Sequence, residues 1–294
     1  MDRPTLILLC GIPGSGKTYY AKEYIEKNPN TVHLSSDSIR AELYGDESTQ
    51  GDPNEVFSLM QKRAIEALNN GQNVVYDATS ITRKDRSYII ALCPKFVKIE
   101  CHIVWGPIET CIERDAARER TVGKEVINRM LKRFQAPYYD EGIHEIKIIR
   151  PYNFNSLQYM TDTFESMKIP HDNPHHTLDV YNHCEAAQNY AYKCGKDDTG
   201  LVMLAAMIHD AGKPYCKAFV DSKGNPCETA HYYQHQCIGA WIAYGICGQS
   251  VTVNIAWLVS VHMDPFLNTK YYNKLPTYLK KQVDLLHEAD LAAH

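Results

Sequence analysis

Short apolar runs alternate with longer segments of mixed polarity through the first half of the chain. The run at residues 4–10 is almost continuously apolar, as is typical of a strand that is buried on both faces. The same reasoning predicts further strands at 31–35, 73–77, 97–104 and 146–149, and helices at 17–27, 54–69, 82–92, 107–120 and 123–135. Strands that alternate with helices build a parallel sheet with helices on both faces, so we expect an α/β domain over residues 1–152.

The pattern changes after residue 150. Residues 153–172 contain asparagines and proline without a helical period, which predicts a linker. The remainder, 173–294, shows no good strand pattern. It predicts an all-α second domain with helices at 175–194, 199–210, 230–246, 251–263 and 275–293.

Composition fits an ordinary globular protein, with 44% hydrophobic and 22% charged residues. No apolar run is long enough to span a membrane and the first residues do not resemble a signal peptide, so we expect a cytoplasmic protein with no membrane contact. The ten cysteines contain no CxxC pair, which favours reduced thiols over a zinc or dithiol site. The net charge of −4 argues against a surface coated with positive charge for bulk binding of nucleic acid.

The segment GIPGSGKT at residues 11–18 has the spacing of a phosphate-binding loop and lies between a predicted strand and a predicted helix. Its glycines let backbone N–H groups surround phosphate oxygens, while a lysine contacts the β- and γ-phosphates and a hydroxyl ligates Mg²⁺. The predicted cofactors are therefore ATP and Mg²⁺. The predicted binding residues are Gly14, Ser15, Gly16, Lys17 and Thr18.

Two charged residues follow the second predicted strand, where ligands bind in open α/β sheets. Asp37 can accept the proton of an attacking hydroxyl, and Arg40 can hold a phosphate of the acceptor. Alternatively, Ser36 or Asp37 caps a helix and the arginine is solvated. Asp77 ends the third strand as a Walker-B-like carboxylate, which would act on Mg²⁺ through water or on the acceptor.

A basic segment over residues 113–133 has two interpretations. It is either a solvated helix face or a lid whose arginine neutralises the phosphoryl group in transfer. Together with GIPGSGKT, SSDSIR, VVYDATSITRKDR and YYDEGIHEI, its RDAARER motif resembles the polynucleotide 5′-kinase branch of P-loop phosphotransferases over residues 1–150.

This resemblance implies roles for the charged residues. Asp37 would be the general base for a 5′-hydroxyl, Arg40 would hold the acceptor's 3′-phosphate, and a lid arginine would contact the γ-phosphate. Arg118 matches the lid position best, followed by Arg114 and then Arg120. Small-molecule and tRNA kinases share the loop and lid, so the acceptor stays open.

Histidine is concentrated after residue 170, where ten of the thirteen occur. The helix LVMLAAMIHDAGK ends with His209 and Asp210, followed by Lys213. Histidines seven or four residues apart share a helix face, and further candidate ligands lie on later helices. Single histidines of this kind are usually core residues, but this many favour a metal site. The remaining candidates are His176, His183, His231, His235, His262 and Asp290.

These residues resemble the HD-domain metal-dependent phosphohydrolases, whose pattern is H, then HD, then D. The resemblance implies a first metal site of His183, His209, Asp210 and Asp290, with His235 and His262 completing a second. His176 competes with His183 for the first position, and His231 would be supporting. Mixed imidazole and carboxylate ligands favour Mn²⁺, Fe, Co²⁺, Ni²⁺ or Zn²⁺ over Mg²⁺. Lys213 would neutralise the substrate phosphate.

Both resemblances together imply a bifunctional enzyme that heals the ends of RNA or DNA. One domain would phosphorylate a 5′-hydroxyl, and the other would remove a 2′-phosphate, 3′-phosphate or 2′,3′-cyclic phosphate before an RNA ligase acts. A small-molecule or nucleotide kinase fused to a nucleotidase is an alternative, as is a nucleotide sensor built on the HD domain.

Overall fold

The computed structural model describes residues 3–174, 177–197 and 199–293. The chain divides into two compact units, and the division is not a single point in the sequence. The first unit comprises Met1–Met130 and Pro137–Tyr152, and the second comprises Leu131–Ala136 and Asn153–His294. Residues 131–136, expected in the first domain, thus belong to the second unit. His176, an expected metal ligand, lies outside the described residues.

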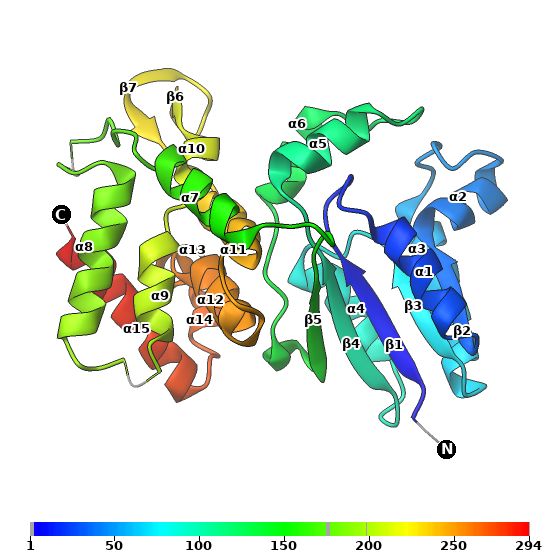
Figure 1. Cartoon of the computed structure of the whole chain (residues 1–294). Coiled ribbons are helices and arrows are strands. Elements are labelled where there is room, and N and C mark those ends of the chain that lie inside the picture. Colours follow the sequence, from blue (N-terminus) through cyan, green and yellow to red (C-terminus); the bar gives the residue numbers. More distant parts are fainter. Residues whose placement is uncertain (1–2, 175–176, 198, 294) are drawn as a thin grey trace. The chain divides into compact units, whose positions relative to one another are not determined.

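The first unit contains a parallel sheet of five strands in the order β2-β3-β1-β4-β5 (Figure 1). The strands are β1 (Thr5–Cys10), β2 (Thr31–Ser35), β3 (Asn73–Asp77), β4 (Lys98–Val104) and β5 (Glu145–Ile149). The helices are α1 (Lys17–Lys27), α2 (Ser36–Tyr44), α3 (Pro53–Asn69), α4 (Arg83–Leu92), α5 (Ile108–Ala116) and α6 (Lys124–Leu131), with a 3-10 turn at Tyr139–Glu141. The α/β prediction is confirmed.

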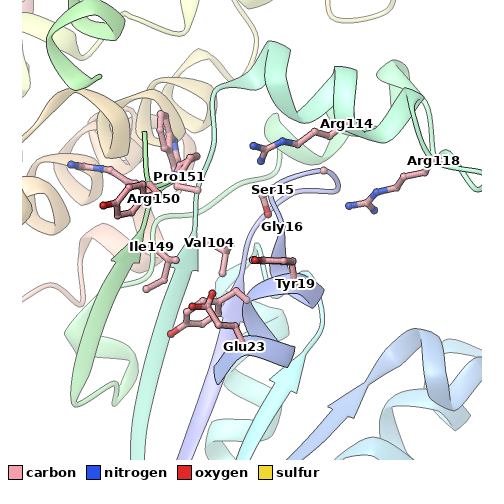
Figure 2. A pocket seen from close by; sticks show the side chains of 14 residues that line it. Ser15, Gly16, Tyr19, Glu23, Val104, Arg114, Arg118, Ile149, Arg150 and Pro151 are labelled. Carbon is pink, nitrogen blue, oxygen red and sulfur yellow. The ribbon is translucent and has the colours of Figure 1, made fainter. Parts of the chain in front are cut away.

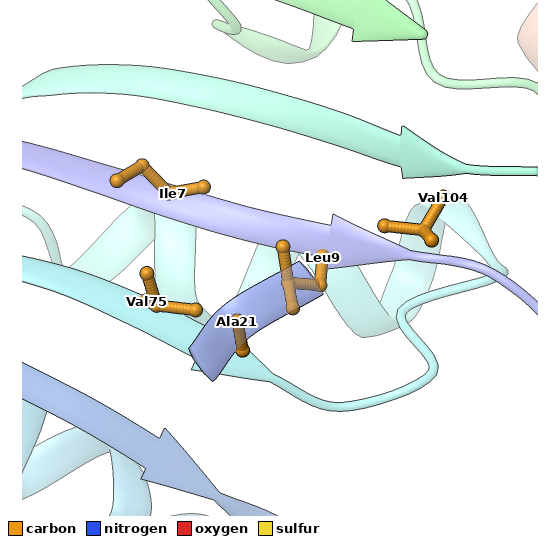
Figure 3. Packing of buried hydrophobic residues seen from close by; sticks show 5 residues of the cluster. All are labelled: Ile7, Leu9, Ala21, Val75 and Val104. Carbon is orange, nitrogen blue, oxygen red and sulfur yellow. The ribbon is translucent and has the colours of Figure 1, made fainter. Parts of the chain in front are cut away.

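The core explains why the first strand is apolar throughout. Figure 3 shows Ile7 and Leu9 of β1 packed with Val75, Val104 and Ala21, the last of which comes from α1. Alternate residues of a strand face opposite sides of the sheet, and the residues on the other side of β1 are equally buried. Burial on both faces thus replaces the alternating pattern of a half-exposed strand.

The second unit is mostly helical, as predicted. Its larger helices are α7 (Ser156–Ser166), α8 (Val180–Lys193), α9 (Leu201–Ile208), α11 (His235–Ile246), α12 (Gln249–Val261) and α15 (Thr277–Ala292). Short helices are α10 (Lys213–Cys216), α13 (Asp264–Leu267) and α14 (Thr269–Tyr272).

Two features of this unit differ from the prediction. The expected absence of strands is wrong, because β6 (Ala218–Val220) and β7 (Pro226–His231) pair as an antiparallel hairpin. These strands are short and largely exposed, so they carry little hydrophobic signal. The expected linker also contains α7, which buries few side chains. Asn155 caps this helix, because its side-chain Oδ1 accepts from the N–H groups of Leu157 and Gln158.

Within the described ranges, no helix is both long and apolar enough to cross a membrane.

Candidate active sites

The loop after β1 leaves the start of α1 open to an anion. Gly16 occupies the N-cap of α1 in a left-handed conformation, with φ 101°. Gly14 also has positive φ, and a Cβ there would lie 2.0 Å from the carbonyl oxygen of Cys111, so only glycine fits. Among the described residues, the buried Ser15 hydroxyl has no hydrogen-bond partner. Such an uncapped helix start with an unpaired hydroxyl suits phosphate oxygens.

Backbone carbonyls of the loop hold the side chain of Lys17 in place. Its ammonium donates to the carbonyl oxygens of Gly11 (2.9 Å) and Ile12 (3.1 Å). Burial lowers the pKa of Lys17, and the nearby Asp77 carboxylate opposes that shift. Asp77 is buried at the last position of β3, where it lies 3.1 Å from the His33 ring nitrogen. The charges of Lys17 and Asp77, both expected from the sequence, are therefore close enough to stabilise each other.

A cavity of about 420 Å³ brings most of the expected phosphotransfer residues together. Asp37 lies at the start of α2, and its carboxylate pairs with Arg40 at 2.6 Å. In the described part of the chain, the N-cap of α2 is Ser35 without a side-chain cap bond, so neither Ser36 nor Asp37 caps this helix. The lining includes Gly14, Gly16, Lys17, Thr18, Asp37, Arg40, Phe57, Asp77, Arg118 and Arg120.

A second cavity of about 830 Å³ lies on the other side of the loop. Figure 2 shows Tyr19 and Glu23 of α1 along one side and Arg114 and Arg118 on the opposite side. The ends of β4 and β5 and the segment after β5, which includes Tyr152, complete the lining. Arg118 lines both cavities, and both cavities also include Gly14 and Gly16 of the phosphate loop. Arg120 instead lies 3.9 Å from Asp37 and 3.6 Å from Glu47.

The arginine-bearing segment is organised by Asp115, a residue that the sequence pattern does not single out. The predicted helix 107–120 ends at Ala116. The buried Asp115 carboxylate then accepts from the Thr121 hydroxyl (2.6 Å) and from the N–H groups of Val122 (3.0 Å) and Gly123 (2.9 Å). A carboxylate that accepts several bonds can hold a loop in one shape. Residues 117–123 are therefore a tethered loop.

The second unit collects four histidines and two aspartates at one buried point. His183 comes from α8, His235 from the first position of α11, and His209 and His262 from the C-terminal ends of α9 and α12. Ligand atoms of His183, His209 and Asp210 lie within 4.8 Å of one another, as do those of Asp210, His235 and His262. The two triads share Asp210.

Asp290, from α15, joins the first triad. Its carboxylate oxygen lies 2.9 Å from Nε2 of His183 and 3.4 Å from Nε2 of His209. His231 does not join, because its ring stacks on Tyr233 at 5.3 Å. Apart from His176 and His231, every histidine and aspartate named as a candidate from the sequence therefore lies in this cluster.

Backbone carbonyls fix which nitrogen of each ring faces the centre of the cluster. Nδ1 of His209 donates to the carbonyl of Ala206 at 2.7 Å, and His235 and His262 donate to their own carbonyl partners at 2.8 Å. A neutral ring that donates through Nδ1 has a lone pair on Nε2. Burial and the neighbouring His235 ring lower the pKa of His262 to about 3, which favours its neutral form.

These lone pairs fit a metal ion. Nε2 of His235 and Nε2 of His262 face each other at 3.2 Å, and Nε2 of His209 has no hydrogen-bond partner among the described residues. Two lone pairs at that distance need a proton or a cation between them. Burial alone would raise the pKa of Asp210, but Lys213 and His209 outweigh it and keep that pKa well below its ordinary value. Burial alone would lower the pKa of His209, but Asp210 and Asp290 outweigh it and hold that pKa well above its ordinary value, so a metal ion would take the place of a proton on this ring. Imidazoles around an ionised carboxylate are a usual ligand set for divalent transition metals, so these groups could hold one or two.

Lys213 lies at the edge of the cluster. Its ammonium is 2.6 Å from Oδ2 of Asp210 and 3.1 Å from Nε2 of His171. His171 was not among the residues expected from the sequence, because a single histidine in a proline-containing segment carries no spacing signal.

Comparison with known proteins covers mainly the first unit. Residues 6–137 match a family described as "AAA domain". No curated protein matches the chain.

Three solved structures show partial similarity to this chain. A Pnkp1/Rnl/Hen1 complex is 26% identical over 42% of this chain and 43% of its own, with a TM-score of 0.36. A gluconokinase from Sinorhizobium meliloti 1021 is 16% identical over 52% and 86%, with a TM-score of 0.37. A fungal RNA kinase is 12% identical over 52% and 40%, with a TM-score of 0.39. The chain thus spans less than half of the first and third of these proteins, and none of the three assigns it a substrate.

Proposed function

We propose that the first unit transfers the γ-phosphoryl group of ATP to the 5′-hydroxyl of an RNA or DNA end. The observation that carries this proposal is the cavity in which Asp37 and Arg40 face the phosphate loop. The larger cavity, beside Tyr19 and Arg114, would take the nucleoside of ATP. Thr18 and Asp77 would hold Mg²⁺.

Each residue then has a defined part in the transfer. The oxygen of the 5′-hydroxyl bonds to the γ-phosphorus while the bond between that phosphorus and ADP breaks, and the Asp37 carboxylate accepts the proton of the hydroxyl. Lys17 and Arg118 neutralise charge on the phosphoryl oxygens, and Arg114 supports the nucleotide. Arg40 binds the phosphate that follows the acceptor nucleoside. Arg120, held between Asp37 and Glu47, closes the acceptor side.

Replacing Asp37 tests this assignment. With labelled ATP and a 5′-hydroxyl oligonucleotide, we expect Asp37→Asn to lower kcat by roughly 10²–10⁴-fold while the KM for ATP stays near that of the wild type. Glu119→Gln, in the same cavity, is the matched control and should retain activity. Unchanged transfer by Asp37→Asn would show that the base is wrong. Transfer to free nucleosides or sugars in preference to the oligonucleotide would favour the small-molecule kinase alternative.

We also propose that the second unit is an HD-type phosphohydrolase that removes a 2′-phosphate, 3′-phosphate or 2′,3′-cyclic phosphate. The shared Asp210 between two buried triads supports this proposal. His183, His209, Asp210 and Asp290 would hold one divalent metal, and His235 and His262 would hold a second with Asp210. A metal bound there would lower the pKa of a bound water and polarise a phosphoryl oxygen. Lys213 would neutralise the phosphate.

Hydrolysis of 2′,3′-cyclic nucleotides with Mn²⁺, Ni²⁺ or Co²⁺ tests the second activity. We expect Asp210→Ala to abolish hydrolysis and to lower bound metal measured by elemental analysis. His231→Gln, outside the cluster, should keep both. If the wild type binds metal but hydrolyses no phosphoester, the sensor alternative is favoured.

Both proposed activities would prepare one broken strand for sealing. Their products, a 5′-phosphate and a free 3′-hydroxyl, are the ends that an RNA ligase joins, so a ligase is the proposed downstream partner. Incubation of an oligonucleotide bearing a 5′-hydroxyl and a 2′,3′-cyclic phosphate with ATP, followed by mass analysis, reports on both ends at once.

A further inference from the structure

A histidine outside the proposed ligand set is buried against the metal-type cluster. His171 is only 1% exposed, and its ring packs edge-on against His183 at a centroid distance of 5.4 Å. It belongs to the segment before α8, where Pro170 and Asp179 form an isolated bridge. No role among the residues described above accounts for its burial.

The position of the His171 ring is fixed on two sides. Its Nδ1 lies 2.8 Å from the carbonyl oxygen of Leu178, and because a carbonyl only accepts, Nδ1 must carry the hydrogen. The backbone carbonyl of His171 in turn accepts a hydrogen bond from the Tyr232 hydroxyl. In the neutral ring, Nε2 is therefore an acceptor with a fixed direction.

That acceptor faces the ammonium of Lys213. Nε2 lies 3.1 Å from Nζ, while Oδ2 of Asp210 lies 2.6 Å from the same nitrogen, and the Tyr232 ring centroid is 5.3 Å away. The Lys213 side chain is 8% exposed. An ammonium has three N–H donors, and His171 accepts one of them. The Asp210 carboxylate beside it holds the charge as an ion pair, so the donors that remain are oriented before any ligand arrives.

We propose, on the basis of the phosphohydrolase function above, that His171 is a positioning residue for Lys213. It holds the ammonium beside Asp210 so that one of the remaining N–H groups meets a phosphoryl oxygen of the substrate. A lysine has a long flexible stem and loses much rotamer freedom when it is fixed in one place. Because His171 fixes it before the phosphate arrives, binding the phosphate no longer includes that loss. His171 itself touches neither phosphate nor metal.

Two substitutions separate this role from a structural one. In His171→Gln, the side-chain amide reaches the position of Nε2 and its oxygen can still accept from Lys213. In His171→Asn, the amide reaches only the position of Nδ1 and can still donate to Leu178. We expect His171→Asn to weaken binding of inorganic phosphate to the Mn²⁺-loaded protein about tenfold, measured by calorimetry, and His171→Gln to stay within about threefold of wild type.

The order of the two variants decides the outcome. If His171 only anchors the segment through Leu178, His171→Asn will bind phosphate better than His171→Gln, and the proposal fails. Equal losses in both variants also contradict it. Bound Mn²⁺, measured by elemental analysis, must stay at the wild-type level in both variants. Its loss would mean that His171 acts through the ligands instead. His287→Asn, in which the replaced ring lies against Phe266, is the control and should behave as wild type.

Failure of the proposed function gives a different result. If wild-type protein binds phosphate but hydrolyses no phosphoester, the phosphohydrolase assignment falls, while the order of the variants still tests His171. If wild type hydrolyses its substrate, kcat/KM should follow the same order as phosphate affinity. A wild type that binds no phosphate would contradict both.

Discussion

Arg86 is a fully buried charge in the first unit, although arginine is rarely buried without a partner. Its guanidinium binds both oxygens of Glu141 at 2.7 and 2.8 Å and donates to the carbonyl of Ser80 at 3.0 Å. Glu141 is almost fully buried as well. We expect Arg86→Met to lower the free energy of unfolding by about 3–5 kcal/mol, because it leaves the glutamate charge unpaired. Urea unfolding measures this loss.

The neighbouring pair Arg83–Asp140 supplies the control for Arg86. It lies 2.8 Å apart but is partly exposed, so we expect Arg83→Met to cost less than about 1 kcal/mol. Adding Glu141→Leu to Arg86→Met should restore part of the stability, since a buried pair can often be replaced by apolar residues. A single Arg86→Met variant as stable as wild type would contradict the assigned role.

Individual residues also show what sequence reasoning could and could not reach. The phosphate-loop motif and the adjacent His–Asp pair have fixed spacing, so Lys17, Thr18, His209 and Asp210 could be proposed as site residues before the structure. Asp115 and His171 could not be, because each acts through neighbours brought to it by loop geometry and neither belongs to a periodic pattern. The hairpin β6–β7 could not be predicted for a similar reason, since short exposed strands lack an alternating apolar face.

At the scale of elements, the loop between α5 and α6 is the part of the first unit with the clearest functional prediction. The Asp115 carboxylate accepts hydrogen bonds from three donors in residues 121–123. Arg118 and Arg120 lie in the sequence between Asp115 and these donors. We expect Asp115→Asn to loosen this loop and to raise the KM for ATP roughly tenfold, because an amide oxygen accepts these bonds less strongly than a carboxylate. Steady-state kinetics on the oligonucleotide substrate measures the change.

The companion variant Thr121→Val removes one of the three donors and should give a smaller change in the same direction. The circular dichroism spectrum and the melting temperature should alter little in either variant, because the loop lies outside the sheet. A variant that melts early but keeps the wild-type KM would show that Asp115 stabilises the fold and does not shape the loop.

At the scale of the whole molecule, the division into units departs from the order of the sequence. Residues 131–136 begin at the last residue of α6, whose other residues lie in the first unit, but they belong to the second. There Phe134 is fully buried, with its ring 5.3 Å from Trp241 and 6.1 Å from Tyr244. The N–H of Ala136 also donates to the Ser260 hydroxyl at 3.3 Å. The first unit also ends at Tyr152, where the sequence places its boundary, but helix periodicity does not reveal which core a helix end joins.

This arrangement predicts which activity a substitution at residue 134 affects. Replacing a buried phenylalanine by alanine typically costs about 3–5 kcal/mol, and here the loss falls on the core that contains α11. We therefore expect Phe134→Ala to lower the proposed metal-dependent hydrolysis and the thermal stability of the second unit, while the proposed ATP-dependent phosphorylation is kept at moderate temperature. Hydrogen exchange followed by mass spectrometry should show faster exchange in α11 and α12 and unchanged exchange in β1 and α1.

Phe96→Ala provides the comparison, since this phenylalanine of the first unit is 47% exposed and its loss should change neither proposed activity. If Phe134→Ala instead speeds exchange in β1 and abolishes phosphorylation, residues 131–136 stabilise the first unit. By the same reasoning, a fragment that begins at residue 153 lacks Phe134 and leaves Trp241 and Tyr244 without that ring. It should melt well below the second unit of the intact chain, and a fragment that begins at residue 123 should recover part of the difference.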